Sequence, residues 1–344
     1  MYFIGVDHHK QVSVMTVLDE NGRELRTERI VNRRGYVQEF LEPYRPFTAV
    51  LEAGRASYVM ADLLRELGGE VKMANPLQVK AIAHARIKTD KRDSRILAQL
   101  LRADLIPEVY QRGEWNRRAQ RVMRTRAYWV GKRTEVRNKI RALLAQQREE
   151  IRLEVEKREA GLFRQKGLEF LGQLDLESPD KLILDDLVQG HREIQAHVKL
   201  TDGLVKVLYG EMEDAVLIDT IPGFARTLSV LAAVEIADIR RFPRLADLHS
   251  YAGVIPSTHA SGNRTFHGHI TKQGSVWLRW AVVEAVYPAI RKDLVLQALY
   301  KRMARRKGAN VAKIVVARRL LTIIYRVLSE KREYIPGLMK QSAA

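Results

Sequence analysis

The sequence predicts an α/β domain followed by mostly helical domains (fold class α/β plus α), and three observations indicate this. Short apolar runs rich in β-branched residues alternate with helical segments over residues 2–101, which is typical of a mixed sheet flanked by helices. Helix-forming residues and long charged side chains then continue over residues 115–214, with few glycines or prolines. The remainder combines apolar helices with a Pro-Gly turn and a basic helical tail. The expected order is therefore a sheet domain, a long helical insertion and a helical C-terminal domain.

The elements of the first domain follow from its apolar runs and turn residues. Strands are expected at residues 2–6, 11–18, 23–31, 48–51 and 71–74, and helices at residues 34–44, 57–67, 76–85 and 88–101. Asn21-Gly22 is a strong hairpin signal between the second and third strands. Gly68-Gly69 is typical of a helix end. The first three strands are therefore expected to form hairpins, and the later strands to alternate with helices.

The helical insertion carries apolar residues near heptad spacing. These are Val122, Trp129, Val136, Ile140, Leu143 and Leu144. The spacing predicts two or three long helices in an antiparallel coiled-coil hairpin, with breaks near residues 161–172 and 178–179. The heptads are imperfect, so they do not give the number of partner helices.

The C-terminal domain contains one turn of functional interest. Ile221-Pro222-Gly223 separates two helices and resembles the helix-hairpin-helix motif, which offers backbone N–H groups to a phosphate. A plain connection between helices would give the same pattern. Residues 248–274 are polar and loop-like, and an apolar helix begins at Ser275. The expected domains are residues 1–112, 113–214 and 215–332, with a tail at 333–344.

Composition narrows the class of protein. A chain of 344 residues with 46% apolar residues suits two or three domains with real cores. The longest apolar runs are interrupted by Arg or Lys, so no membrane span and no membrane partner are expected. The N-terminus lacks a signal-peptide pattern, and the absence of cysteine excludes disulfides and thiolate metal sites. We expect a cytoplasmic protein that associates with the nucleoid when it binds DNA.

The net charge of +18 is concentrated in two segments. Residues 115–166 carry 16 basic against 6 acidic residues, and residues 291–332 carry 13 against 2. Clustered basic residues neutralise phosphates, so nucleic acid is the favoured partner, ahead of a solvated helix face or an anionic membrane surface. The candidate contacts are Arg117, Arg118, Arg121, Arg124, Lys132, Arg133, Gly223, Arg264, Lys272, Arg279, Arg305, Arg306 and Lys307.

Four acidic residues form the candidate metal site. Asp7 and Glu52 each follow an apolar strand, and Asp90 and Asp93 are three residues apart, on one face of a helix. Each acid alone has a simpler explanation, as a turn-former, a helix cap or a partner of the helix dipole. Four hard carboxylate ligands without cysteine suit Mg²⁺ or Mn²⁺. Two such ions can clamp the attacking and leaving oxygens of a phosphodiester.

These residues resemble a known family, the DEDD transposases of bacterial insertion sequences. The motifs that carry the resemblance are Asp7, the Leu-Glu-Ala-Gly of residues 51–54, the Thr-Asp-x-x-Asp of residues 89–93, the Ile-Pro-Gly of residues 221–223, the Tyr-Ala-Gly-Val-Ile-Pro of residues 251–256, Ser261-Gly262 and the segment 268–274. The resemblance covers nearly the whole chain, with both halves in order. It implies an RNase H-type (RuvC-like) nuclease fold for residues 1–112.

The resemblance also implies a mechanism and partners. Members of this family recombine donor and target DNA, guided by a noncoding RNA of the element called a bridge or seeker RNA. Their active site is composite, because the metal-binding acids of one subunit meet a nucleophilic serine of another. The matching position is Ser261, which would form a phosphoserine intermediate. A homo-oligomer, either a dimer or a tetramer, is therefore expected.

Other assignments stay open from the residues alone. Ser261 could be only part of a glycine-rich turn, Ser275 is typical of a helix N-cap, and Ser257 lies in an expected turn. No histidine spacing is typical of a zinc site, although His267 or His269 could contact phosphate. The alternative enzyme is a RuvC-like Holliday-junction nuclease that hydrolyses DNA with metal-activated water. The alternative of another class is a non-catalytic protein that binds RNA or DNA.

Overall fold

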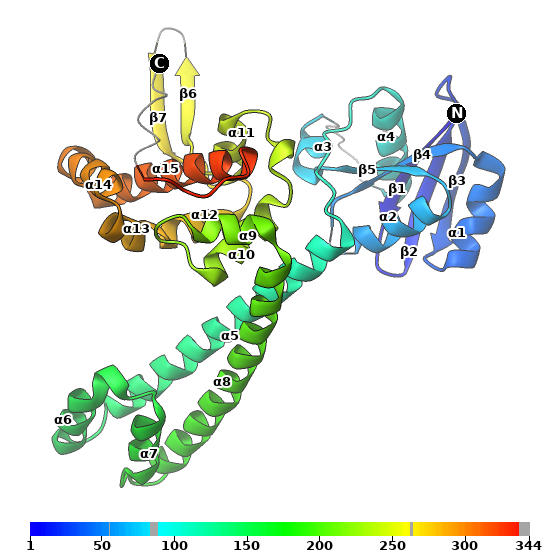
Figure 1. The fold of residues 1–344 in the computed structure, drawn as a ribbon. Helices are drawn as coiled ribbons and strands as arrows, with labels where there is room; N and C mark the ends of the chain where they lie inside the picture. Colours follow the sequence, from blue (N-terminus) through cyan, green and yellow to red (C-terminus); the bar gives the residue numbers. More distant parts are fainter. Residues whose placement is uncertain (55, 83–88, 262–263, 337–344) are drawn as a thin grey trace. The chain divides into compact units, whose positions relative to one another are not determined.

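The computed structural model describes residues 1–54, 56–82, 89–261 and 264–336 (Figure 1). Contacts among residues divide the chain into two compact units, Met1–Gln111 and Arg112–Ala344. Among the described residues, no helix is both long enough and apolar enough to cross a membrane.

The first unit contains a five-stranded mixed sheet. Its strands are β1 (Tyr2–His8), β2 (Val12–Leu18), β3 (Glu24–Val31), β4 (Phe47–Glu52) and β5 (Glu70–Ala74). The strand order is β3-β2-β1-β4-β5, in which β1, β2 and β3 pair antiparallel and β1, β4 and β5 pair parallel. The predicted mixed sheet is confirmed, and β1 is its central strand.

Helices cover both faces of this sheet. They are α1 (Arg34–Leu41), the 3₁₀ turn η1 (Glu42–Tyr44), α2 (Ser57–Glu66), α3 (Pro76–Ile82) and α4 (Asp90–Arg102). Apolar residues of α1 and α2 pack in one core with Ala49 and Leu51 of β4. Val50, which points to the opposite face, packs in a second core with Leu97 and Leu101 of α4. Successive side chains of β4 thus point to opposite faces of the sheet, and different helices cover each face.

The second unit begins with a long antiparallel helix pair. Its elements are α5 (Glu114–Leu144), α6 (Glu149–Arg158), the 3₁₀ turn η2 (Glu159–Gly161), α7 (Gln165–Gln173) and α8 (Asp180–Glu211). Helices α5 and α8 lie side by side (Figure 1). Arg126 pairs with Asp202 at 2.6 Å, and the Trp129 ring stacks on His197 at 4.2 Å between centroids, which fixes the opposed directions. Near the end of the pair, α6 and α7 enclose a small core around Ile140, Leu171 and Leu184.

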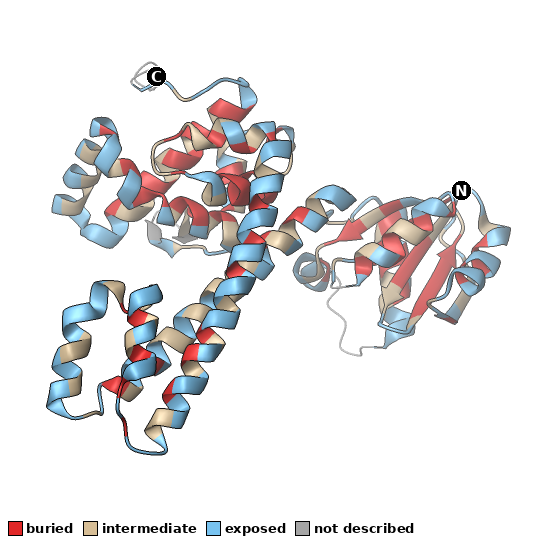
Figure 2. Ribbon diagram, turned by 60° about the horizontal axis from the view of Figure 1, so that its bottom comes forward, coloured by how far each residue is buried: buried red, intermediate tan, exposed pale blue. Residues whose placement is uncertain are grey.

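The remainder of the second unit is mostly helical. Its elements are α9 (Glu213–Asp219), α10 (Arg226–Ile236), η3 (Ile239–Arg241), α11 (Leu245–Tyr251), β6 (Pro256–Ser261), β7 (Arg264–Ile270), α12 (Val276–Glu284), α13 (Val286–Lys292), α14 (Leu294–Lys307) and α15 (Ala309–Ser329). Their apolar residues form the largest core in the described part of the chain. Every residue from Ser229 to Ile236 of α10 is buried. Figure 2 shows buried residues, in red, along helices of this unit.

Two expectations are corrected. Residues 248–274, expected as a polar loop, contain most of α11 and the antiparallel hairpin of β6 and β7, so Ser257 lies in a strand. No strand is predicted there because both strands carry polar residues in place of an apolar alternation. Strand β1 also continues past Val6 to His8, because Asp7 and His8 pair with Val14 and Ser13 of β2.

The three-way division into residues 1–112, 113–214 and 215–332 stays a prediction.

Candidate metal centre

The sheet places Asp7 at the carboxyl end of its central strand. Val6, the residue before it, is fully buried and pairs with Leu51 of the parallel strand β4. Glu52, the last residue of β4, therefore ends at the same edge of the sheet as Asp7. The carboxyl ends of parallel strands are the usual place for a site in such sheets. Two of the predicted acids are thus held on neighbouring strands by backbone pairing.

Helix α4 brings a third acid to this edge because Gly5 lets the helix approach β1 closely. A Cβ atom on Gly5 would lie 1.9 Å from the Ser94 carbonyl oxygen and 2.5 Å from the Ala98 nitrogen. The buried Ser94 hydroxyl also bonds the hydroxyl of Thr16 in β2, at 2.8 Å. These contacts fix α4 on the sheet, with its first turn beside the end of β1.

The first turn of α4 is capped in the way the sequence allowed. The side chain of Thr89 accepts a hydrogen bond from the backbone N–H of Arg92 at 3.4 Å. Asp90 and Asp93 both fall in this first turn, where negative charge is favoured by the helix dipole. The dipole at the N-terminus of α4 therefore offsets part of the repulsion that Asp90 and Asp93 experience from the acids nearby.

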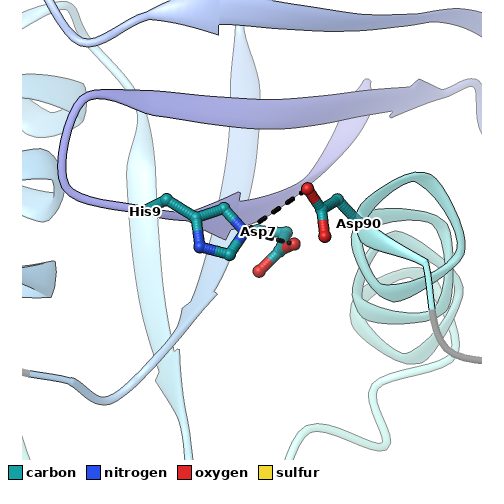
Figure 3. A group of neighbouring side chains, drawn as sticks. All are labelled: Asp7, His9 and Asp90. Carbon is teal, nitrogen blue, oxygen red and sulfur yellow. Dashed lines mark hydrogen bonds and ion pairs between the residues drawn. The ribbon is translucent and has the colours of Figure 1, made fainter.

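Asp7, His9 and Asp90 form a compact cluster, in which one ligand atom from each lies within 4.8 Å of the others (Figure 3). His9 Nε2 lies 3.1 Å from an Asp7 carboxylate oxygen and 3.6 Å from an Asp90 carboxylate oxygen. The Asp7 side chain is 22% exposed, whereas those of His9 and Asp90 are 49% and 57% exposed. The cluster is thus anchored at a half-buried carboxylate and open to solvent on its other side.

The electrostatics of the cluster raise the pKa of Asp7 above its usual value. Burial is the largest cause, and the neighbouring charges of Asp90 and Asp93 act in the same direction. His9 opposes the shift through its charge and its hydrogen bond. The pKa of His8 is lowered, first by burial and then by His9. The folded chain thus holds negative charge at Asp7 against a net penalty, which a bound cation would reduce.

The other predicted residues have different placements. Asp93 is close enough to affect the pKa of Asp7 but lies outside the three-residue cluster. Glu52 stands at the end of β4 and is likewise not a member of it. Ser261 is the last residue of β6 in the second unit. The side chains of Ser261 and Arg264, and all of Gly262, lie outside the described residues.

His9 is the residue that sequence reasoning missed. The spacing of the histidines is not typical of a zinc site and therefore predicts no ligand, yet His9 Nε2 is the atom between the two aspartates. A signal was available, because side chains two residues apart on an extended chain point to the same side. His9 stands two residues after Asp7, just beyond the last residue of β1.

The donor set fits a divalent cation. Two carboxylates and an imidazole within 4.8 Å supply three ligands, and the like charges around Asp7 give a reason to bind a cation. Carboxylates suit both Mg²⁺ and Mn²⁺.

The predicted nucleic-acid contacts fall into two groups. The side chains of the first group are exposed: Arg121, Lys272, Arg305, Arg306 and Lys307. Arg118 and Lys132 are also on the surface, but they pair with Glu114 and Glu135 of their own helix. The second group is tied to the fold: Arg117 donates to the Arg112 carbonyl, Arg124 to Glu235, Arg133 to Gln195 and Arg279 to the Ala252 carbonyl.

Gly223 also has a packing role in the fold. Its φ is +94°, and a Cβ atom there would lie 2.2 Å from the Ala285 carbonyl oxygen. The turn between α9 and α10 can therefore pack against the start of α13 only with glycine at this position.

A buried carboxylate links the start of α5 to the C-terminal helices. Glu235, 2% exposed, lies 2.9 Å from the Ser275 hydroxyl and 3.1 Å from Gln120 Nε2. Arg124 and Arg112 lie 3.3 and 3.5 Å from its oxygens. Ser275 also accepts from the Leu278 N–H at 3.1 Å, so its predicted role as a helix N-cap is confirmed.

Comparisons with known proteins match both halves of the chain. Residues 4–148 match the family model for the DEDD transposases of the IS110 type, described as a transposase. Residues 215–301 match the model described as the transposase IS116/IS110/IS902 family. The first match covers the acids and α5, and the second ends within α14.

Curated relatives are similar over nearly the full length. A probable family 20 transposase of Pseudomonas aeruginosa is 24% identical over 97% of this chain and 98% of its own. The transposase for insertion sequence element IS1111A of Coxiella burnetii is 25% identical over 97% of this chain and 91% of its own. A pilin gene-inverting protein of Moraxella bovis is 27% identical over 77% of this chain and 74% of its own.

The two models match in the order that the sequence motifs predicted, and the first contains the sheet, Asp7 and the first turn of α4. A divalent metal site and DNA binding are properties of this family. The resemblance is confirmed, and the chain belongs to the IS110 family of DEDD transposases, the DNA-processing enzymes of insertion sequences.

Proposed function

We propose that this transposase cuts and rejoins DNA strands at a site made by Asp7, Glu52, Asp90 and Asp93, with Ser261 as the nucleophile. The observation that carries the proposal is the convergence of Asp7 and Asp90 at one edge of the sheet, with His9 between them. Mg²⁺ or Mn²⁺ is the proposed ion. When bound, it would neutralise charge on the phosphate oxygens in the transition state.

The chain's own residues would orient the reaction. Asp7 and Glu52 are fixed by strand pairing, and Asp90 is fixed by the packing of α4 on Gly5. Carboxylates on rigid elements keep their positions when the substrate binds, which lowers the reorganisation needed at the moment of reaction. His9, half exposed, is available as a further ligand or as a group that holds a proton near the phosphate.

The serine step is a transesterification. The Ser261 oxygen forms a bond to phosphorus while the bond from phosphorus to one bridging oxygen of DNA breaks. The hydroxyl proton passes to a base, and the released strand ends in a hydroxyl that takes up a proton. The reverse attack, by the hydroxyl of another strand, releases serine and joins the DNA. The number of phosphodiester bonds is conserved, so rejoining needs no external energy source.

Partners follow from the same proposal. Ser261 belongs to a unit other than that of the acids, and in a composite site it would come from another subunit. The antiparallel pair of α5 and α8, read as a coiled coil, is the proposed element of assembly into a dimer or tetramer. A noncoding guide RNA is the proposed source of target choice, alongside donor and target DNA.

A cleavage assay tests the proposal. Wild-type protein incubated with nicked donor DNA and Mg²⁺ or Mn²⁺ should give a protein–DNA adduct on a denaturing gel. Asp7→Asn should abolish cleavage while DNA binding persists, and Ser261→Ala should abolish the adduct and strand exchange. Full strand exchange by Ser261→Ala would refute the serine step and favour hydrolysis by a RuvC-like junction nuclease. Unchanged DNA processing by Asp7→Asn would refute the metal site, and absence of any cleavage by the wild type would favour a non-catalytic binding protein.

The guide RNA is tested separately. RNA that co-purifies with the protein should be enriched in one noncoding sequence. A purified protein that carries only random RNA fragments, and exchanges strands equally well after RNase treatment, would contradict RNA guidance.

A further inference from the structure

A basic hollow lies near the end of the antiparallel helix pair, in the second unit. It has a volume of about 580 Å³, which is within the range of small-ligand pockets. Its lining includes Arg133 and Arg137 from α5, His191 and Arg192 from α8, and Phe163 and Glu169 from α7 and the turn before it. The small core of α5, α6, α7 and α8 supports these walls. The hollow is therefore preformed by packing.

The positive charge of this hollow is poorly compensated. Among the described residues, none of Arg133, Arg137 and Arg192 forms an ion pair with a carboxylate. The one acid of the lining, Glu169, is exposed and accepts a hydrogen bond from Gln165 at 3.2 Å. The pKa of Arg137 is lowered, first by burial and then by the charges of Arg133 and Arg141. Three guanidinium groups and one carboxylate therefore belong to the residues that line the hollow, so its net charge is positive.

His191 supplies an unused buried donor. His191 is 1% exposed. Arg137 Nε donates a hydrogen bond to His191 Nε2 at 3.0 Å. Since Nε2 accepts, the proton of the neutral ring lies on Nδ1. Within the described parts of the chain, His191 Nδ1 has no hydrogen-bond partner, and the same is true of the buried Arg133 Nε. Buried donors without acceptors are rare and point to a missing partner.

The remaining contacts hold the donors in place. The guanidinium of Arg137 lies 4.9 Å from the centroid of the Phe163 ring, and the rings of Phe163 and His191 are 5.4 Å apart. Arg133 is anchored by a hydrogen bond from its Nη1 to Gln195 at 3.0 Å. The donors are thus oriented before any ligand arrives.

We propose that this hollow is a phosphate-binding pocket that takes one backbone phosphate of nucleic acid. A phosphate offers several acceptor oxygens and a negative charge, which match the three guanidinium groups and the imidazole of the residues that line the hollow. A nucleic-acid phosphate is favoured over a protein carboxylate because α5 is strongly basic and the family processes DNA. The pocket is a separate site from the acids of the first unit and goes beyond the proposed function.

Histidine NMR of the full chain gives a direct test. The protein, which has nine histidines, is labelled with ¹⁵N-histidine, and the His191 signal is assigned by its loss in His191→Gln. The pKa of His191 is lowered to about 4, by burial first and then by Arg137, Arg133 and Arg192. A short DNA duplex should shift the Nδ1 signal and raise this pKa, because an anion would then face the ring alongside these arginines and Glu169. Inorganic phosphate is titrated in parallel.

A matched pair of double variants distinguishes phosphate binding in the pocket from the effect of positive charge elsewhere on these helices. Arg137→Gln/Arg192→Gln should lose the His191 response, bind DNA about tenfold more weakly and lower the salt slope by ~0.9 for the lost phosphate contact. Arg148→Gln/Arg152→Gln removes the same charge from exposed positions at α6 and should keep the His191 response. If the first double variant fails to fold, as judged by circular dichroism, the exposed Arg192→Gln alone carries the comparison and should weaken the response.

Three results would overturn the proposal. The first is a His191 signal that neither DNA nor phosphate moves. The second is a response to inorganic phosphate without a response to DNA, which would make the pocket a site for free anions. The third is an equal loss of DNA affinity in both double variants with the His191 response intact. Asp7→Asn is expected to lose cleavage and keep the His191 response, so a failure of the pocket is distinguishable from a failure of the proposed catalytic site.

Discussion

Gly5→Ala tests whether the packing of α4 on β1 builds the metal site. The added Cβ would lie 1.9 Å from the Ser94 carbonyl oxygen, and Cβ contacts closer than 3.0 Å essentially do not occur. The atoms that block it belong to the backbone of α4 and cannot move away by a side-chain rotation. The helix must therefore shift from the strand by about 1.1 Å or more, because overpacking of this kind cannot be relieved locally.

This shift would act on stability and on the site to different degrees. Overpacking lowers the free energy of unfolding by about 1–3 kcal/mol. In a unit of this size, each kcal/mol lowers the melting temperature by ~4–8 °C. Asp90 stands in the first turn of α4, so the same shift moves its carboxylate relative to Asp7. A misplacement of about 1 Å costs on the order of 100-fold in rate. Metal-dependent cleavage should therefore fall about 100-fold in protein that is still folded at 25 °C.

The measurements are calorimetric melting, Mn²⁺ binding and DNA cleavage, all made on the full chain. Gly35→Ala is the matched control, because Gly35 lies in α1 of the same unit and a Cβ there would meet no atom within 4 Å. Alanine should leave cleavage unchanged there and slightly raise the melting temperature, since it favours helix over glycine. Wild-type cleavage and Mn²⁺ affinity in Gly5→Ala would refute the reasoning, even if its melting temperature fell.

Three further predictions follow from the charges of the fold. Because the pKa of Asp7 is raised in the folded state, its ionisation destabilises the folded chain as pH rises above 3.8. Asp7→Asn should therefore melt at a higher temperature than wild type at pH 7 without metal, and Mn²⁺ should no longer raise its melting temperature. An equal rise in melting temperature with Mn²⁺ in both proteins would contradict this. Glu235→Ala leaves the buried Arg112 without its carboxylate and should cost about 3–5 kcal/mol in denaturant unfolding, whereas Glu235→Gln should cost less. The pKa of His249 is lowered to about 4 by burial and by Arg318, so stability should fall as pH drops from 6.5 towards 4, and His249→Gln should flatten that part of a pH–melting profile.

Much of the first unit could be predicted from the sequence because its signals are local. Apolar runs and the Asn21-Gly22 turn predicted the strands, and strand ends gave the positions of Asp7 and Glu52. The role of Gly5 could not be predicted, because it depends on Ser94 and Ala98, which are far away in the sequence. Sequence spacing placed Asp90 on a helix face but not beside β1.

The second unit was predicted less well where its contacts are long-range and polar. The hairpin of β6 and β7 lacks an apolar alternation, so only the pairing of its backbone reveals it. Arg124, a predicted nucleic-acid contact, also donates to the buried Glu235, a contact that the sequence does not indicate. A count of charges does not distinguish an arginine that is free for a phosphate from one that already has a carboxylate partner.

Glu235 and Asp7 are both acids held in place by the fold, but the donors around them give them different roles. Glu235 is buried, and its oxygens lie within 3.5 Å of donors from Arg112, Gln120, Arg124 and Ser275. Its charge is therefore satisfied inside the chain, and the residue acts as a structural link. Among the described residues, the Asp7 side chain has one hydrogen-bond partner, His9, while Asp90 and Asp93 add like charge from α4. The strands and the close packing at Gly5 hold these negative charges near one another. A divalent cation bound there would reduce their repulsion, which no residue of the cluster fully offsets.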